Sequence, residues 1–463
     1  MVAARALLCS TMRPMDSEHL SDLRRIDAAH FLHPFTDHAD LHRGGTHVMQ
    51  SASGCHVVDE TGRRLLDGLA GLWCVNVGYG RREIADAVHR QMLDLSFYPS
   101  FFNTTTEPTI LLAEKIASRA PAGMSKVFFS NSGSEANESA LKLVRGYNKI
   151  LGRPRKTRIF SRTFSYHGVC IATTSMTGLP SCYEPFDLPL PGFVHVPGPH
   201  AYGVASELSV EDYASWCIAE TERIIEREGA DTIAAMFAEP VQGAGGVIVP
   251  PPGHLRELRE LCRRHDILFV ADEVITGFGR LGAWFASELW NLEPDMITMA
   301  KGITSGYVPL GATLVSDAIA DTLSKSGYLA HGFTYSGHPV STAAALANID
   351  ILERERLVEK VHDHIGLHFQ NRLQALASHP AAGEVRGAGL IGAIDLLPKG
   401  GRAALATPPV LGVKAAAMAR EEGVIVRGIR DLIAIAPPLV ITRDEIDFLF
   451  DALARVLDRV GAA

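Results

Sequence analysis

Residues 254–265 (HLRELRELCRRH), 267–271 (ILFVA) and 296–300 (MITMA) form the stretch of sequence that decides the fold. In the first run, leucines recur at helical spacing among charged residues, and each apolar run that follows has the length of a buried strand. The same reasoning predicts strands at 126–129, 158–160 and 232–238 and a helix at 141–150. Helices that alternate with short apolar strands predict an α/β fold with a mostly parallel sheet covered on both faces.

The two ends of the chain follow a different pattern. A helix is predicted from Asp16, and two strands at 55–67 around the Glu60-Thr61-Gly62 turn. After residue 347 we predict two helices, strands at 390–395, 424–427 and 432–436, and a closing helix from Thr442.

These patterns predict four regions of the chain. Residues 1–15 are interpreted as a leader or a misassigned start. Residues 16–75 form an N-terminal segment that packs with the smaller domain and the entrance of the site. Residues 76–346 form the large domain, and residues 347–463 form a smaller α+β domain.

Composition narrows the class of protein. The 463 residues include 44 Lys and Arg against 52 Asp and Glu, a net charge of -8, and no long basic run. This balance argues against a nucleic-acid partner. No apolar stretch reaches the roughly 18 residues of a membrane span. The seven cysteines are scattered without a CxxC pair, so the sequence predicts a reducing, cytoplasmic setting.

Three features follow predicted strands at their carboxyl ends, where parallel sheets bind ligands. Residues 130–135 (SNSGSE) open a helix whose free N–H groups favour a phosphate. Asp272 ends one apolar strand, and Lys301 directly follows the next. Singly, these are a helix cap, an ion-pair member and an exposed amine. Together they are the parts that pyridoxal phosphate requires, an anion seat, an acid for the pyridine nitrogen and an amine for the Schiff base.

From about His30 to the last helix, the chain resembles the class III, or omega, aminotransferases of the fold-type I pyridoxal-phosphate enzymes. The motifs that carry the resemblance are LWCVNVGYG (72–80), NSGSEAN (131–137), YHGV (166–169), EPVQGAGG (239–246), DEVITGFGR (272–280), AKG (300–302) and TYSGHP (334–339).

The resemblance implies a role for each matched residue. Lys301 would form the Schiff base and then move a proton between the substrate carbon and the cofactor, while Asp272 would hold the pyridine nitrogen protonated. Thr334 would reach the phosphate of a neighbouring subunit, which implies a homodimer or a dimer of dimers. The implied cofactor-binding residues are Ser132, Gly133, Ser134, Tyr166, His167, Glu239, Asp272, Val274, Lys301 and Thr334.

The resemblance also implies a substrate pocket, formed by Trp73, Phe101, Phe102, Tyr166, Val169 and Arg427. Ordinary core packing is the alternative for the apolar members of this set. Arg427 would bind the carboxylate of a keto acid and swing away for an apolar amine. Relatives mostly carry Gly where this chain has Arg430, so either arginine could meet the carboxylate.

Two further patterns suggest other chemistry and are rejected. Residues 277–282 (GFGRLG) match the GxGxxG spacing of dinucleotide-binding turns, but they begin six residues after the strand ends. His30, His33, His38, His42 and His47 lie close in sequence without HExxH spacing or a cysteine partner. We therefore expect neither a nicotinamide site nor a metal site.

The leading hypothesis is transamination from a primary amine or omega-amino acid to pyruvate or a similar keto acid. The alternatives are a diamine (putrescine-type) or 4-aminobutyrate aminotransferase, or another pyridoxal-phosphate reaction such as decarboxylation or an aminomutase shift. A binding protein without activity is a further alternative, but Lys301, Asp272 and the phosphate seat together argue against it.

Overall fold

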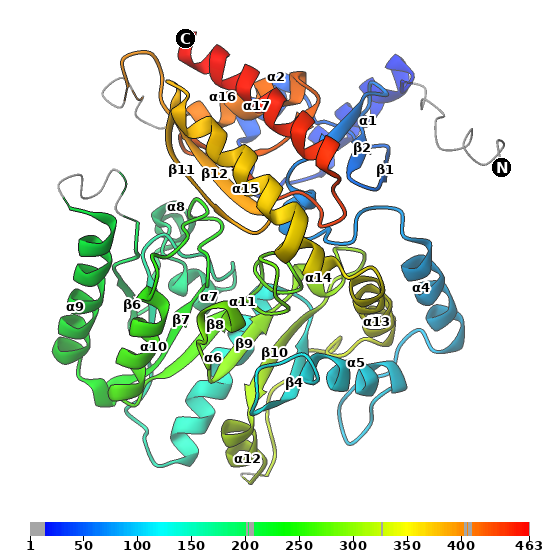
Figure 1. Cartoon of the computed structure of the whole chain (residues 1–463). Helices are drawn as coiled ribbons and strands as arrows, with labels where there is room; N and C mark the ends of the chain where they lie inside the picture. Colours follow the sequence, from blue (N-terminus) through cyan, green and yellow to red (C-terminus); the bar gives the residue numbers. More distant parts are fainter. Residues whose placement is uncertain are drawn as a thin grey trace.

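The computed structural model describes residues 14–200, 202, 208–325, 327–401, 405 and 410–462, so the predicted leader lies almost entirely outside the described residues. A seven-stranded sheet forms the centre of the larger part of the molecule (Figure 1). In spatial order its strands are β4 (Met124–Ser130), β10 (Gly311–Ser316), β9 (Met296–Met299), β8 (Leu268–Asp272), β7 (Ile233–Ala238), β5 (Arg158–Arg162) and β6 (Phe193–Val196).

The prediction of a mostly parallel sheet is confirmed. The neighbouring strands from β9 to β6 pair in parallel, whereas β10 runs antiparallel to both β9 and β4. The sequence analysis does not predict β10, because its sequence GATLVS lacks the continuous apolar run that marks the buried parallel strands.

Alternating side chains of the central strands pack into two different cores. Phe269 and Ala271 of β8 belong to the core under α9 (Val210–Glu228) and α10 (His254–Arg264). Val270, between them, belongs to the core under α6 (Gly133–Ile150), α7 (Ile171–Met176) and α12 (Asp317–Lys325). A fully buried Phe or Val side chain of this kind stabilises the fold by about 1.5–3 kcal/mol. Helices on both faces leave the carboxyl ends of the strands as the accessible edge.

The larger part is completed by helices at one side of the sheet and by short connecting helices. Helices α4 (Arg82–Asp94) and α5 (Glu107–Ala117) pack against α13 (Pro339–Arg354). The predicted domain boundary at residue 346 lies inside α13, and the boundaries stay a prediction. The shorter helices are α3 (Ala70–Trp73), α8 (Pro180–Tyr183), α11 (Ala286–Trp290) and α14 (Leu357–Lys360).

The C-terminal part contains an antiparallel sheet in the order β11 (Ala382–Ala388), β12 (Ile391–Leu396), β15 (Leu432–Ile435), β14 (Arg427–Ile429). Helices α15 (Gly366–Ala375), α16 (Leu411–Glu421) and α17 (Arg443–Ala462) pack with it (Figure 1). The single strand predicted at 424–427 is wrong. The chain forms β13 (Val424–Ile425) and β14 there, because the two ends of this stretch pair with strands of different sheets.

The N-terminal segment and the C-terminal part share a sheet. Helix α1 (Ser17–His30) begins as predicted after Asp16, whose carboxylate accepts from the His19 N–H, and α2 (His38–Gly44) follows. The predicted hairpin is confirmed as β2 (His56–Val58) and β3 (Arg64–Asp67), with β1 (Ser51–Ser53) beside β2. Strand β13 completes this sheet by pairing in parallel with β3. Within the described residues, no helix is both long and apolar enough to cross a membrane.

Candidate active site

A cavity of about 790 Å³ lies at the carboxyl edge of the central sheet, and the C-terminal part forms one of its walls. Its lining includes the N-terminus of α6, the end of β8, the residue that follows β9, and strand β14 with its turn. The predicted site residues that line it are Trp73, Gly133, Ser134, Tyr166, His167, Glu239, Asp272, Val274, Lys301 and Arg427.

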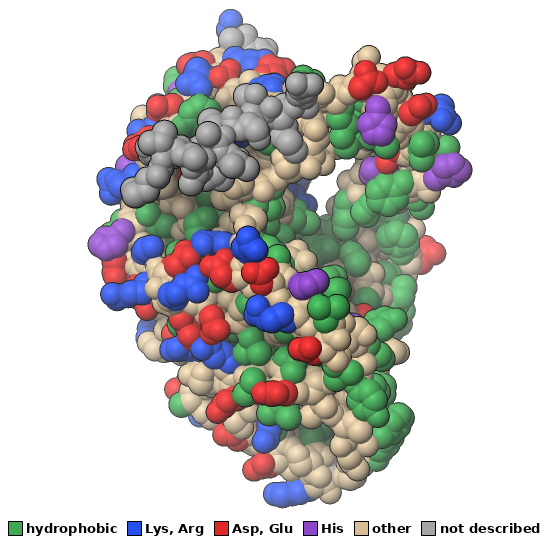
Figure 2. All heavy atoms as spheres, turned by 90° about the vertical axis from the view of Figure 1, so that its right-hand side faces the viewer, with side chains coloured by type: hydrophobic (Ala, Val, Ile, Leu, Met, Phe, Trp, Pro, Cys, Tyr) green, Lys and Arg blue, Asp and Glu red, His purple; other side chains and the backbone are tan. Residues whose placement is uncertain are grey.

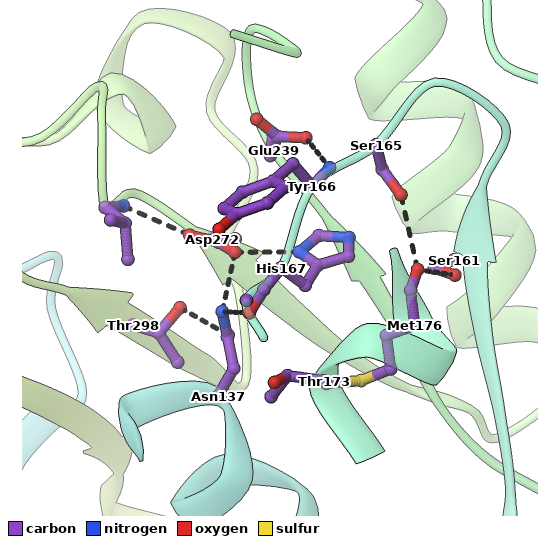
Figure 3. Close-up of polar contacts among 12 residues, drawn as sticks. Asn137, Ser161, Ser165, Tyr166, His167, Thr173, Met176, Glu239, Asp272 and Thr298 are labelled. Atoms are coloured by element: carbon purple, nitrogen blue, oxygen red, sulfur yellow. Dashed lines mark hydrogen bonds and ion pairs between the residues drawn. The ribbon is translucent and has the colours of Figure 1, made fainter. Parts of the chain in front are cut away.

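Asp272 is 3% exposed, and three donors orient its carboxylate (Figure 3). Oδ2 accepts from Nδ1 of His167 at 2.7 Å and from Nδ2 of Asn137 at 2.8 Å. Oδ1 accepts from the backbone N–H of Val274 at 3.1 Å. A buried carboxylate is stable only when its oxygens are satisfied in this way, so the three bonds fix Asp272 at the floor of the cavity.

Asn137 is a residue of this site to which the sequence analysis gives no role. Its amide also donates to the carbonyl of His167 at 2.9 Å, and its Oδ1 accepts from Oγ1 of Thr298 at 2.9 Å (Figure 3). The sequence does hold a signal for it, because Asn137 lies four residues after Gly133 and therefore on the same face of the helix.

Lys301 follows β9 and reaches the same cavity. Burial lowers the pKa of its amine, and the carboxylates of Asp272 and Glu239 oppose that effect. Its Nζ lies 5.6 Å from the centre of the Trp73 ring. Its φ of 47° is in the left-handed region, which is unusual for a residue other than Gly. A desolvated amine of lowered pKa is the form in which lysine acts as a nucleophile.

The N-terminus of α6 has the geometry that the predicted anion seat requires. Gly133 and Ser134 occupy the first two helical positions, whose N–H groups have no partner within the helix. A Cβ at Gly133 would lie 2.9 Å from Cγ1 of Val274, so only glycine lets the helix start this close to the end of β8. Ser132 caps the helix, its hydroxyl accepting from the N–H of Glu135 at 3.2 Å, and it does not line the cavity.

Glu239 is a second buried carboxyl group in the cavity. Its oxygens accept from the N–H groups of Tyr166 at 2.9 Å and Gly243 at 3.0 Å, while Arg162 donates to its backbone carbonyl. Burial raises the pKa of Glu239 to about 7. These bonds connect the end of β7 to the loop that carries Tyr166.

Two arginines of the C-terminal part line the cavity. The guanidinium of Arg427 lies 4.9 Å from the centre of the Trp73 ring, and within the described part of the chain it has no hydrogen bond or ion pair. Arg430 donates to the carbonyl of Gly245 at 2.5 Å and lies 5.3 Å from the centre of the Phe164 ring. Both are therefore placed where a substrate carboxylate could reach them.

Besides Ser132, four predicted residues lie outside this cavity. Phe101 and Phe102 line a second hollow of about 890 Å³, together with residues of β4 and residues 328–332. Thr334 is exposed, and Val169 is 56% exposed with its N–H donating to Oγ of Ser134 at 3.1 Å. The single chain does not bring these four residues to Lys301.

Other lining residues had no signal in the sequence, among them Phe35 of the N-terminal segment, Leu179 just before α8 and Cys182 within α8. They reach the cavity only through tertiary packing. The GxGxxG match and the histidine cluster, which the sequence analysis rejects as ligand sites, lie in different local structures. The 277–282 segment is a turn in which the N–H of Gly282 bonds to the carbonyl of Gly279. In the described residues, no group of three or more His, Cys, Asp or Glu side chains could hold a metal ion.

The residues of the cavity fit pyridoxal phosphate. Lys301 offers a buried amine to its aldehyde, Asp272 a fixed carboxylate to its pyridine nitrogen, and the start of α6 unpaired N–H groups to its phosphate. In addition, Nε2 of His167 is buried and has no hydrogen-bond partner among the described residues, which leaves a polar atom of the floor free for a further contact.

Comparisons with known proteins agree with this fit. The family model "Aminotransferase class-III" matches residues 41–457. The putrescine–pyruvate aminotransferase of Pseudomonas aeruginosa is 43% identical over 94% of this chain and 95% of its own length. The diaminobutyrate–2-oxoglutarate transaminase of Halomonas elongata is 41% identical, over 90% of this chain and 91% of its own.

Solved structures give the same result. An (S)-enantioselective omega-transaminase from Thermomicrobium roseum superposes with a TM-score of 0.91 at 43% identity, covering 95% of this chain and 98% of that one. The omega-transaminase of Pseudomonas jessenii, solved in complex with PMP, superposes with a TM-score of 0.91 at 41% identity over the same shares of the two chains. The chain therefore belongs to the class III aminotransferases, which use pyridoxal phosphate as their cofactor.

Proposed function

We propose that this enzyme transfers an amino group from a primary amine or an omega-amino acid to pyruvate or a similar keto acid. The observation that carries the proposal is the meeting of Lys301, Asp272 and the N-terminus of α6 in one cavity. When bound there, pyridoxal phosphate supplies a ring that accepts the electrons released when the substrate loses a proton.

In this proposal, Lys301, Asp272 and the first residues of α6 have different roles. Lys301 would hold the cofactor, and once a substrate amine had displaced it, Nζ would take the proton from the amino-bearing carbon and deliver it to the cofactor. Burial lowers the pKa of this amine, which favours the unprotonated form that can accept a proton. Asp272 balances the charge of the pyridine nitrogen, and the N–H groups of Gly133 and Ser134 hold the phosphate.

We assign substrate recognition to the wall formed by Trp73 and Arg427. The Trp73 ring offers an apolar surface to an amine without a carboxylate. The guanidinium of Arg427, which rests on that ring, binds a keto-acid carboxylate bidentately and turns away when none is present. In this assignment Tyr166 and Val274 contact the cofactor ring, and Glu239 and His167 lie at its polar edge.

Diamine or 4-aminobutyrate donors are the second candidate. The names of two relatives support it, the putrescine–pyruvate aminotransferase of Pseudomonas aeruginosa and the gamma aminobutyrate transaminase 1 of Solanum lycopersicum, which is 42% identical over 89% of this chain. A panel of amines with pyruvate as the acceptor and alanine formation as the readout distinguishes the donors.

We further propose that the enzyme is a homodimer, or a dimer of dimers, and that it works in the cytoplasm. Phe101, Phe102 and Thr334 then contribute to the cavity of the partner subunit, which explains why they lie outside the cavity of their own chain. We also retain the division into residues 16–75, 76–346 and 347–463 as part of this proposal.

The decisive experiment removes the amine. Wild-type enzyme should carry the yellow absorbance of bound cofactor, whereas Lys301→Ala should lose both that absorbance and turnover. Asp272→Asn should keep some cofactor but lose most activity, because a neutral amide cannot hold the ring proton. Lys360→Ala, which removes an exposed lysine at the end of α14, is the matched control and should behave like wild type. Pyruvate-dependent turnover by Lys301→Ala would refute the proposal.

A further inference from the structure

Arg430 occupies a backbone position that favours glycine. It lies in the turn between β14 and β15, and its φ of 51° is in the left-handed region. A side chain with a Cβ costs free energy in this conformation, and an arginine gains nothing locally in return. Such outliers concentrate at functional sites, where contacts of the side chain offset the strain.

The contacts of Arg430 fix its guanidinium at the cavity wall. One nitrogen donates to the carbonyl of Gly245, and the group lies against the ring of Phe164. A guanidinium has five N–H donors, so a single carbonyl leaves most of them available to a ligand.

The charge of Arg430 also lacks a direct counterion. Among acidic groups, Asp395 has the strongest electrostatic effect on Arg430, but Asp395 already forms an ion pair with Arg386, as does Glu384. Asp431, the next residue, accepts from the N–H of Leu411. Across the described segments, no ion pair involves Arg430, so a positive charge remains on the wall.

Arg427, three residues earlier in the same hairpin, presents a second unpaired guanidinium to the cavity. A monocarboxylic keto acid needs only one of them. We propose that Arg430 determines acceptor specificity, binding the second carboxylate of a dicarboxylic keto acid whose first carboxylate is held by Arg427. This inference rests on the proposed transamination, and it adds dicarboxylic keto acids, bound by both arginines, to the acceptors that one arginine can hold.

Equilibrium binding tests the inference without turnover. Glutarate and pentanoate have the same carbon chain, except that a methyl group replaces one carboxylate, and neither has a keto group that can react. In calorimetric titrations of the holoenzyme, we expect wild type to bind glutarate about tenfold to a hundredfold more tightly than pentanoate. Arg430→Gly should reduce this ratio to about one, and Arg430→Lys should keep part of it because the cation remains.

The Arg430→Gly variant supplies the residue that the backbone conformation favours, so loss of folding does not complicate the result. The inference is overturned if wild type binds the two acids equally or binds neither, or if Arg430→Gly keeps the preference for glutarate. The amine half-reaction, followed in wild type by the change in cofactor absorbance, reports separately on the proposed function. If wild type shows no amine half-reaction, the proposed transamination is wrong. The ratio of the glutarate and pentanoate binding constants tests the role of Arg430 independently of that result.

Discussion

At the scale of single residues, the site depends on carboxyl groups that the fold removes from water. Burial raises the pKa of Glu239 to about 7, whereas in the unfolded chain this group titrates near 4.5. Between these values the folded protein binds more protons than the unfolded chain. The contribution of Glu239 to stability is therefore most favourable below pH 4.5 and declines as the pH rises through this window.

The wild-type enzyme should accordingly lose stability relative to Glu239→Gln as the pH rises from about 4.5 to about 7, by about 3 kcal/mol in total. Urea unfolding of both proteins across this range measures the difference. Glutamine cannot accept from both Tyr166 and Gly243 as the carboxyl group does, so the two proteins also differ in stability by an amount that does not depend on pH. The test is therefore how the difference in unfolding free energy changes with pH. A difference that does not change with pH would show that Glu239 titrates normally.

Asn137 tests the network around Asp272. Replacing it with leucine, which is similar in shape, removes a donor from Asp272 and another from the His167 carbonyl, so we expect unfolding to become easier by about 1–3 kcal/mol. Thr298→Val removes only the outer bond to Asn137 and should cost about 1 kcal/mol. Equal losses in the two variants, measured by urea unfolding, would contradict a network centred on Asp272.

Asp272 and Lys301 could be predicted because the first ends an apolar strand and the second follows the end of the next, and strand ends in a parallel sheet converge on one edge. The contacts of Asp272 could not be predicted. Asn137, His167 and Thr298 come from a helix, a loop and another strand, and their meeting requires the final packing of these elements. Spacing along the chain carries information within an element, not between elements.

At the scale of elements, the start of α6 determines how closely an anion approaches the sheet. Gly133→Ala would place its Cβ 2.9 Å from Cγ1 of Val274 and push the helix start away from β8. We expect this variant to bind pyridoxal phosphate at least about tenfold more weakly, since a charge-assisted contact of about 1.4 kcal/mol is lost. Titration of the apoenzyme with the cofactor, followed by absorbance, measures the effect.

The same helix offers the control. A Cβ at Gly146 would have Leu323 as its nearest neighbour at 3.7 Å, which is ordinary contact. Gly146→Ala should therefore leave cofactor affinity unchanged and stabilise the protein by about 0.5–1 kcal/mol, as expected for alanine within a helix. If both variants bind the cofactor normally, the close approach of α6 to β8 is not what positions the phosphate.

Elements differ in how well sequence predicts them. Strands β7, β8 and β9 are almost entirely apolar and lie buried in the sheet, so their sequences are enough to predict them. Strand β10 has a mixed sequence and is held by its two neighbours. Strands β13 and β14 belong to different sheets although one residue separates them, and only the partners available in the folded chain decide this.

At the scale of the whole molecule, apolar side chains remain exposed on one face of the chain. Figure 2 shows hydrophobic side chains gathered along one side of the molecule. Phe102 and Tyr328, which line the second hollow, are 81% and 83% exposed, and Ile110 beside them is 57% exposed. Patches of this kind mark interfaces. The same hollow includes Phe101, so an interface there would bring predicted pocket residues to a partner subunit.

A dimer formed through this face makes a quantitative prediction. Burying a phenylalanine contributes about 1.5–3 kcal/mol, and introducing a charge removes that gain, so Phe102→Asp should raise the dissociation constant of the dimer by at least about tenfold. Sedimentation measures it, and cofactor should be released as monomers form, because Thr334 then reaches no partner phosphate. Leu367→Asp, at a position on α15 that is 59% exposed, is the control and should change neither property. A monomer with full activity and bound cofactor would exclude a site completed by the partner.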